Sequence, residues 1–329
     1  MRLAPTTVRL VSLIALGLAF TPRAEAEEVT FASASPYQLG DLLSAASPPY
    51  DVKVSADLVY PDETKKPMPA FVFMHGSSGP LLRHQRYLEL ARKLGFVTLQ
   101  VDSFGPRGIG STIGNQSNVT AAMMTIDVLR ALKFLAERPD IDPKKIVIMG
   151  SSKGAIAALY ATWKPIREKV VGALDYAGYV LLYPLCTNIE DGDVSASPVH
   201  VYIGDQDNWT PAAPCIEQVK RMKALGRNWA ITLYAGAYHA FDAPIEGIRD
   251  MPHAYSMVDC CIALRADGYE YEIGSGYGLT RAERGKAFRA CAKKGAVKIG
   301  GYHAADALSR DVRAFLGSVL DAHAIRPRH

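Results

Sequence analysis

The 329-residue sequence lacks several features that would mark particular classes of protein. After residue 20, no segment approaches the roughly 20 consecutive apolar residues that a membrane-spanning helix needs, which argues against a membrane anchor. No basic run is interleaved with aromatic residues and the net charge is only +4, so nucleic acid is not expected as a partner. No His-Glu-x-x-His motif occurs and the five cysteines lack the paired spacing of a zinc site, so no metal is expected.

The chain begins with the features of a secretory signal peptide. A basic head, residues 1–9, precedes a short apolar run, residues 10–20, and the small-residue cleavage signal Ala24-x-Ala26 follows. The alternative is a buried N-terminal helix, but these three features occur together in the order that export requires. We therefore expect residues 1–26 to be removed and the mature protein, from about Glu27, to be secreted or periplasmic.

Short apolar segments alternate with amphipathic ones along the rest of the chain. Residues 50–60 alternate polar and apolar side chains, as a strand at a sheet edge does. Later runs are apolar throughout, which is typical of strands buried on both faces, and they comprise Ala70–Met74, Phe96–Val101, Ile146–Met149, Tyr179–Tyr183, Val199–Ile203 and Ile231–Tyr234. Between them, segments with apolar residues three and four apart predict helices at Gln85–Leu94, Ala121–Ala136, Ala155–Trp163 and Ile216–Leu225.

This alternation predicts an α/β fold with a doubly wound, mostly parallel sheet and helices on both faces. Ligand sites in such folds lie beyond the carboxyl ends of the strands. About 300 mature residues are consistent with a single domain. A segment at about 246–302, which is richer in Cys, Gly, Arg and Lys, interrupts the pattern and is interpreted as an insertion before a last helix at about 304–319.

The sequence Gly150-Ser-Ser152-Lys-Gly154 follows an apolar strand and precedes a helix. Strand, Gly-x-Ser-x-Gly and helix in this order form a nucleophile elbow, in which the middle serine is held in a strained pose that exposes its hydroxyl. A Cβ at either glycine would collide with the neighbouring strand and helix. We therefore expect Ser152 to be a nucleophile and the backbone N–H of Lys153 to face an oxyanion. The alternative is a glycine-rich structural turn.

A second glycine-rich turn, His75-Gly-Ser77-Ser-Gly79, follows an earlier predicted strand. A hydrolase with this elbow takes its other oxyanion donor from a turn in that place. The backbone N–H of Ser77 is the expected donor. His75 is expected to fix the turn, because in this fold the catalytic base comes after the nucleophile in the sequence.

Two later turns carry the residues expected to complete a Ser-His-Asp triad. The turn after residues 199–203 offers Asp205 and Asp207. Asp207 is favoured because Gly-x-x-Asp with a proline four residues later is the usual acid turn in such hydrolases, and Asp205 would then bond to backbone N–H groups of its loop. His239, in the turn after the last strand, is the expected base, with a structural histidine as the alternative. The order Ser152, Asp207, His239 is the one that this fold uses.

With these motifs in place, the chain resembles the dienelactone hydrolase family of α/β-hydrolases over about residues 50–242 and the last helix. The resemblance implies hydrolysis of an ester or lactone, with no metal and no organic cofactor. Family members that open dienelactone typically use cysteine as nucleophile, so Ser152 is a departure and the named lactone is not inherited as substrate. The motifs that carry the resemblance are His75-Gly-Ser-Ser-Gly79, Asp102-Ser-Phe-Gly-Pro-Arg107-Gly, Gly150-Ser-Ser-Lys-Gly154, Gly204-Asp-Gln-Asp207 and Gly236-Ala-Tyr-His239-Ala-Phe-Asp.

The expected activity is that of a carboxylic ester hydrolase acting on a small-molecule ester or lactone through an acyl-enzyme at Ser152. Acyltransferases and peptidases use the same triad, because water, an alcohol or an amine can each release an acyl-enzyme, and the sequence does not separate them. A non-catalytic binding protein on this scaffold is the alternative from another class. It is disfavoured because all triad positions and both oxyanion turns are present.

Arg107 follows the predicted strand at 96–101, on the same rim as the elbow. One hypothesis is that its guanidinium points into the pocket and binds a substrate carboxylate. The other is that it pairs with Asp102 or a nearby backbone carbonyl and holds the loop.

The five cysteines would meet an oxidising compartment after export. Cys186 and Cys215 follow neighbouring predicted strands and are expected to be bridged. Cys291 is expected to pair with Cys260 or Cys261, which leaves one thiol. The alternative is five buried thiols.

Overall fold

The computed structural model describes residues 26–44, 50–62 and 65–324. Apart from Ala26, the expected signal peptide lies outside these residues. The described chain contains a central eight-stranded sheet, three small sheets and eight α-helices. Within the described residues, no helix is both long and apolar enough to cross a membrane.

The central sheet has the strand order β1-β2-β4-β3-β5-β6-β8-β9. β1 and β2 pair antiparallel, as do β2 and β4, and every other neighbouring pair is parallel. The carboxyl ends of the parallel strands therefore meet at one rim. The strands are β1 (Glu27–Ser33), β2 (Val52–Val59), β3 (Met68–Met74), β4 (Val97–Asp102), β5 (Ile141–Ser151), β6 (Gly178–Leu182), β8 (Val199–Gly204) and β9 (Trp229–Tyr234).

The edge of the sheet differs from the expectation. The alternating segment at 50–60 was expected at the edge, but its strand β2 lies second, and β1 covers it in antiparallel register. β1 keeps its place because Val29 and Phe31 are buried, with the ring of Phe31 packed 5.6 Å from that of Phe134. The apolar pattern of β1 is short and lies directly after the expected cleavage site. It therefore did not predict a strand.

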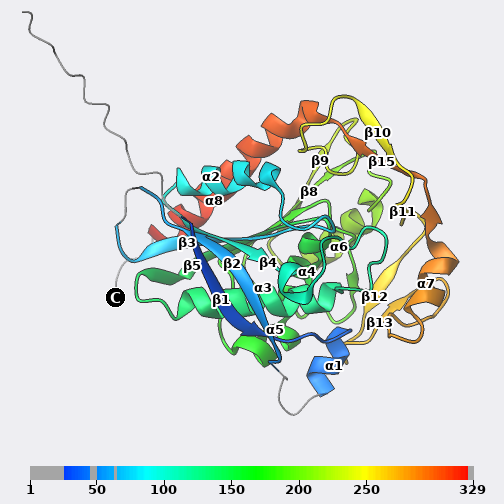
Figure 1. Ribbon diagram of the computed structural model, residues 1–329, viewed down its shortest axis with the longest axis horizontal. Coiled ribbons are helices and arrows are strands. Elements are labelled where there is room, and N and C mark those ends of the chain that lie inside the picture. Colours follow the sequence, from blue (N-terminus) through cyan, green and yellow to red (C-terminus); the bar gives the residue numbers. More distant parts are fainter. Residues whose placement is uncertain (1–25, 45–49, 63–64, 325–329) are drawn as a thin grey trace, which may run out of the picture.

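Helices cover both faces of the sheet, as predicted. In Figure 1, α2 and α8 lie side by side on one side of it, and α3, α4 and α5 lie on the other. The helices are α1 (Leu39–Ser44), α2 (Gln85–Arg92), α3 (Ala121–Ala136), α4 (Lys153–Ala161), α5 (Lys164–Val171), α6 (Ala212–Ala224), α7 (Arg284–Cys291) and α8 (Ala305–Ala324), with short 3₁₀ turns at Leu82–His84, Gly105–Arg107 and Tyr302–Ala304.

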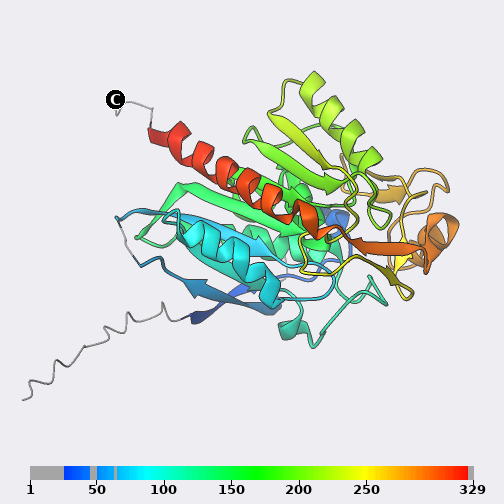
Figure 2. The same cartoon turned by 90° about the horizontal axis from the view of Figure 1, so that it is seen from above.

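The segment at about 246–302 forms short strands and α7, which gather at one end of the molecule (Figure 2). Two of its pairings, β10 with β15 and β11 with β14, join the beginning of the segment to its end. A third sheet joins β12 to β13 and to β7, which lies outside the segment. These strands are β7 (Asn188–Ile189), β10 (Ile248–Met251), β11 (Tyr255–Ser256), β12 (Ile262–Leu264), β13 (Glu270–Glu272), β14 (Lys293–Lys294) and β15 (Val297–Gly300).

Two disulfides stabilise this end of the molecule. Cys186 is bonded to Cys215, which confirms the first expected bridge. Cys260 is bonded to Cys291, which resolves the second, and Cys261 is a free, exposed thiol. The second bridge ties the beginning of β12 to the end of α7.

We expect the double variant Cys260→Ser/Cys291→Ser to lose about 3–4 kcal/mol of unfolding free energy, because the bridge closes a loop of roughly 30 residues in the unfolded chain. Denaturant unfolding of the oxidised proteins measures the loss. Cys261→Ser is the matched control, since its thiol is unbonded and exposed. Equal stability of the double variant and this control would show that the bridge contributes nothing.

Candidate active site

Ser152 lies in the turn between β5 and α4 with φ 52° and ψ −118°. This conformation is rare for a residue with a side chain and lifts the hydroxyl away from the backbone. The chain can turn this tightly because glycines stand two residues before and two residues after Ser152. A Cβ on Gly150 would collide with the carbonyl group of Gly154, and a Cβ on Gly154 would collide with the carbonyl oxygens of Met74 and His75 in and after β3.

The structure brings together the three residues expected to form a triad. His239 Nε2 lies 2.9 Å from Ser152 Oγ, and His239 Nδ1 lies 2.8 Å from Asp207 Oδ2. The side chains of His239 and Asp207 are 2% and 0% exposed, so water does not compete for these bonds. The carboxylate accepts a hydrogen bond from the Nδ1–H group, so the proton stays on Nδ1, and this leaves Nε2 free to accept the proton of the Ser152 hydroxyl.

The two candidate acids differ in what they bond. Asp207 Oδ1 accepts the backbone N–H groups of Trp209 and Thr210, both at 2.9 Å, which leaves Oδ2 for the histidine. Asp205 Oδ1 instead accepts the N–H of Gly236 at 2.8 Å, in the turn that leads to His239. Asp205 thus has the loop-fixing role that was its alternative, but it bonds to the turn before His239 rather than to N–H groups of its own loop.

Thr210 is a neighbour of the triad that the sequence analysis did not single out. Its hydroxyl lies 3.0 Å from His239 Nδ1 and 3.3 Å from Asp207 Oδ2, and it donates to the backbone carbonyl of Tyr183 at 3.0 Å. The hydroxyl therefore links the acid, the base and the end of β6. Thr210 lies three residues after the candidate acid in the sequence, and this spacing could have indicated its role.

Tyr183 is the second residue that was missed. Its ring packs edge-on to His239 at 4.7 Å, while the ring of Trp209 lies 4.8 Å from the same imidazole. The Tyr183 hydroxyl donates to Asp242 at 2.8 Å, and the Tyr87 hydroxyl donates to the same carboxylate at 3.0 Å. These contacts hold the imidazole ring in place. No sequence pattern indicates them, because they join one residue of α2 to residues in the loops after β6, β8 and β9.

Backbone strain is concentrated at this site. Among the described residues, the non-glycine positions with positive φ are Ser152, Tyr183 and Ala240, at 52°, 40° and 52°. They are the candidate nucleophile, the residue packed on the candidate base and the residue that follows that base. Such strain persists only where the surrounding structure imposes it, and it is found preferentially at functional sites.

The residues of the two expected oxyanion donors line the same hollow as Ser152. Lys153 is the first residue of α4, where backbone N–H groups have no acceptor within the helix. Ser77 follows β3 and lines both hollows that adjoin Ser152. The turn before Ser77 approaches closely, since a Cβ on Gly76 would lie 3.2 Å from Ser152 Cβ.

His75 fixes this turn, as expected. Its fully buried ring donates from Nδ1 to the carbonyl of Gly76 at 2.8 Å and accepts the N–H of Ser103 at Nε2, at 3.1 Å. Burial lowers the pKa of His75, which keeps the ring neutral and able to accept at Nε2. It therefore joins the ends of β3 and β4 beside the elbow.

Arg107 does not reach the hollows at Ser152. Its guanidinium forms a two-pronged ion pair with the buried carboxylate of Asp127, at 2.7 and 3.0 Å, and also donates to the carbonyls of Ser103 and Ala34. The substrate-binding hypothesis is therefore corrected in favour of loop support. The partner is Asp127 rather than Asp102, whose carboxylate accepts N–H groups of its own loop.

We expect Arg107→Met to cost about 3–5 kcal/mol of unfolding free energy, because it leaves the carboxylate of Asp127 buried without its cation. Denaturant unfolding measures this loss. The remaining folded enzyme should lose similar activity on anionic and neutral esters of equal size. A loss confined to the anionic ester would restore the substrate-binding hypothesis.

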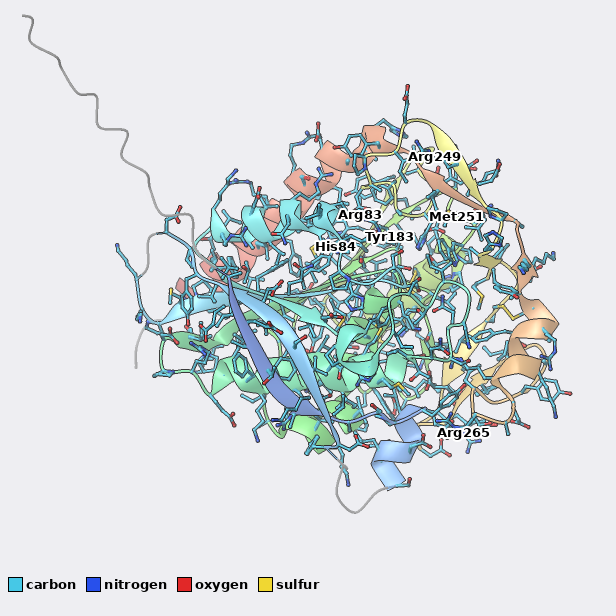
Figure 3. All side chains as sticks on the ribbon, in the orientation of Figure 1. Arg83, His84, Tyr183, Arg249, Met251 and Arg265 are labelled. Atoms are coloured by element: carbon cyan, nitrogen blue, oxygen red, sulfur yellow. A yellow bond between two sulfur atoms is a disulfide. The ribbon has the colours of Figure 1, made fainter. Side chains whose placement is uncertain are left out.

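Two hollows adjoin Ser152. One is lined by Ile156, Leu185, Trp209 and Phe288, together with the side chain of Lys153, and is mostly apolar. The other lies on the His239 side and is lined by Arg83, Tyr183 and Met251, whose positions Figure 3 labels. A substrate whose ester bond lies at Ser152 could therefore place its acyl group in one hollow and its leaving group in the other. Across the described residues, no cluster of three or more His, Cys, Asp or Glu side chains could hold a metal ion.

This geometry can be compared with known proteins. A model of the dienelactone hydrolase family matches residues 54–256, which is more than half of the chain. The chain belongs to the dienelactone hydrolase family. It is therefore a member of a family of hydrolases, and the α/β-hydrolase fold predicted from its sequence is confirmed.

Two curated proteins share part of the sequence of this family member. A Bradyrhizobium protein named "probable 2-oxo-3-(5-oxofuran-2-ylidene)propanoate lactonase" is 27% identical over 168 residues, which cover 48% of this chain and 66% of that protein. The thiohydrolase apmlB of Arthrinium phaeospermum is 32% identical over 107 residues, covering 32% of this chain and 34% of its own. The chain thus spans just under two thirds of the first relative and about a third of the second.

Solved structures that are similar to this chain include a thermophilic esterase and a protein named Est1E. Est2 of Thermogutta terrifontis is 19% identical, with a TM-score of 0.48 over 67% of this chain and 84% of its own. Est1E of Butyrivibrio proteoclasticus is 17% identical, with a TM-score of 0.44 over 58% of this chain and 88% of its own.

Proposed function

We propose that this protein is a serine hydrolase that cleaves an ester or lactone bond through an acyl-enzyme at Ser152. The observation that carries the proposal is the bonded series Ser152, His239, Asp207, at 2.9 and 2.8 Å, on a strained elbow. Membership of a hydrolase family supports it, as does the lactonase name of the Bradyrhizobium relative. The family resemblance also implies that no metal or organic cofactor takes part.

In the proposed reaction, Ser152 Oγ attacks the carbonyl carbon of the substrate while His239 Nε2 takes the hydroxyl proton. The carbonyl oxygen becomes an oxyanion that accepts the N–H groups of Ser77 and Lys153. The bond to the leaving oxygen then breaks, and that oxygen takes the proton from His239. Water, whose proton the same nitrogen takes, attacks the carbonyl carbon of the acyl-enzyme. The bond to Ser152 Oγ breaks, this oxygen takes the proton back from His239, and the acid is released. Asp207 holds the imidazole in the required tautomer and stabilises its charged form.

A neutral fluorophosphonate probe tests the proposal directly. We expect one phosphonyl adduct per chain, and peptide mass spectrometry should place it on Ser152 rather than on the adjacent Ser151. Ester hydrolysis should fall in proportion to labelling. Labelling on another residue, or full activity of the fully labelled protein, would contradict the proposal.

We also propose that the protein works outside the cytoplasm, in the periplasm or after secretion. Two disulfides support this, because such bonds persist in oxidising compartments, and so does the signal-like sequence of residues 1–26. Mass spectrometry of the protein isolated from its native host should find an N-terminus near Glu27. An intact N-terminus in a cytoplasmic fraction would contradict this.

A further inference from the structure

The apolar hollow beside Ser152 contains two buried cationic side chains, Lys153 and Arg284. They are only 4% and 8% exposed. Removing a cation from water costs several kcal/mol unless an anion or a set of acceptors replaces the water. The partners of these two side chains therefore indicate what the hollow is built to receive.

The ammonium group of Lys153 bonds to neutral groups only. Its Nζ donates to the hydroxyl of Thr112 at 3.1 Å and to the carbonyl of Gln116 at 3.0 Å. An ammonium group has three donors, so two acceptors leave one N–H unused. Within the described part of the chain, no carboxylate forms an ion pair with it. Burial and the nearby charge of Arg284 both lower the pKa of Lys153.

Arg284, at the start of α7, contacts the rings of Tyr37 and Phe288 but forms no hydrogen bond or ion pair in the described structure. Its Nε is buried without a hydrogen bond, and its guanidinium lies over the ring of Phe288 at 5.0 Å. Glu270 is close enough for the charge of Arg284 to lower its pKa against the effect of burial. The Glu270 carboxylate, however, accepts the Tyr160 hydroxyl at 2.7 Å, and no ion pair with Arg284 forms in the described structure.

We propose that this hollow binds an acyl group that ends in a carboxylate, with Arg284 and Lys153 as the residues that recognise that carboxylate. The inference rests on the proposed ester hydrolysis at Ser152 and specifies its substrate class. The apolar walls would hold the carbon chain of the substrate, and the two cations would bind its far end. A carboxylate accepts several hydrogen bonds and matches the planar guanidinium in shape.

The size of the hollow favours a short chain. Its volume is about 90 Å³. A hollow of this volume can hold a short acyl chain but not a long one. The acyl group of a glutarate half-ester is of this size.

The position of Arg284 makes the preference a property of this chain. The family match ends at residue 256, and Arg284 comes from the disulfide-bonded segment beyond it. Arg107, by contrast, lies within the matched region and is held by Asp127. The matched region thus contributes the proposed triad, and the added segment contributes the cation.

Two para-nitrophenyl esters of equal shape test the inference. The first is the hemiglutarate, and the second carries an isopropyl group in place of the terminal carboxylate. We expect kcat/KM for the wild-type protein to favour the hemiglutarate roughly 10- to 100-fold, as expected of hydrogen bonds to a charged group. A wild-type protein that prefers the neutral ester, or treats both equally, overturns the inference.

Variants assign the preference to the two cations. Arg284→Met keeps the length and apolar contacts of the side chain and should remove most of the preference for the hemiglutarate. Lys153→Met provides a second test should the first variant fail to fold. Arg281→Met is the matched control, because Arg281 is exposed and lies outside this hollow, and it should keep the wild-type ratio. If both Arg284→Met and Lys153→Met keep the full wild-type preference for the hemiglutarate, the inference is overturned.

Fluorophosphonate labelling separates this inference from the proposed function. Labelling of Ser152 without a preference for the hemiglutarate leaves the hydrolase intact and overturns the substrate class alone. Failure of both labelling and hydrolysis overturns the proposed function itself.

Discussion

Replacement of Ser152 by alanine is expected to lower kcat/KM for any hydrolysed ester by roughly a thousandfold or more. The variant lacks the oxygen that forms the acyl-enzyme, and no other hydroxyl is bonded to His239 Nε2 in the described structure. Steady-state hydrolysis and burst kinetics measure the loss. Because the three residues act as a unit, adding His239→Ala to Ser152→Ala should cost little more.

Ser151→Ala is the matched control for this substitution. Ser151 is the preceding residue, and its hydroxyl is buried without a hydrogen-bond partner. We therefore expect its removal to leave hydrolysis within a few-fold of the wild-type value. If Ser151→Ala is the damaging change and Ser152→Ala is not, the assignment of the nucleophile is wrong.

Asp207→Asn is expected to lower kcat by roughly 10⁴-fold while the protein still folds. An amide at this position can donate to His239 Nδ1, which would place the imidazole proton on Nε2 and prevent that nitrogen from accepting the Ser152 proton. The backbone N–H groups of Trp209 and Thr210 can still bond to the amide oxygen, so the turn is preserved. Activity measurements and the circular dichroism spectrum together check both expectations.

Asp205→Asn is the comparison, because Asp205 lies in the same turn and, among the described residues, its carboxylate accepts a hydrogen bond only from the N–H of Gly236. An asparagine oxygen can accept that bond equally well. A large loss for Asp205→Asn with little loss for Asp207→Asn would show that the acid has been assigned to the wrong carboxylate.

The parts of this fold that a local pattern determines were predicted from the sequence. The strands β3, β4, β5, β6, β8 and β9 each contain a mostly apolar run, and each was predicted to within a few residues, apart from an earlier start of β5. Helices cover both faces of the sheet, although β9, at its edge, is only partly buried. The elbow was predictable because Gly150 and Gly154 are required by contacts between neighbouring backbones. The positions of Asp207 and His239 followed from turns at the ends of parallel strands, which meet at one rim.

Features that depend on contacts distant in the sequence were not predictable. Arg107 was expected to bond to Asp102 or a carbonyl, but its main partner is Asp127 on α3, and only the packing of α3 against the sheet brings that carboxylate there. Likewise, the bonds of Asp242 to Tyr87 and Tyr183 join three different parts of the chain. Buried polar groups bond to whichever partner the fold brings close to them, and the local spacing of residues in the sequence does not predict that partner.

The strained backbone at Ser152, Tyr183 and Ala240 creates a trade-off between thermal stability and catalytic activity. Each such residue costs about 1–3 kcal/mol, in a protein whose whole stability is expected to be about 5–15 kcal/mol. Glycine at position 152 would relieve the strain and remove the oxygen of the proposed nucleophile in one step. Selecting variants by melting temperature alone would therefore enrich inactive proteins. Directed evolution of this protein should measure activity and melting temperature in the same round.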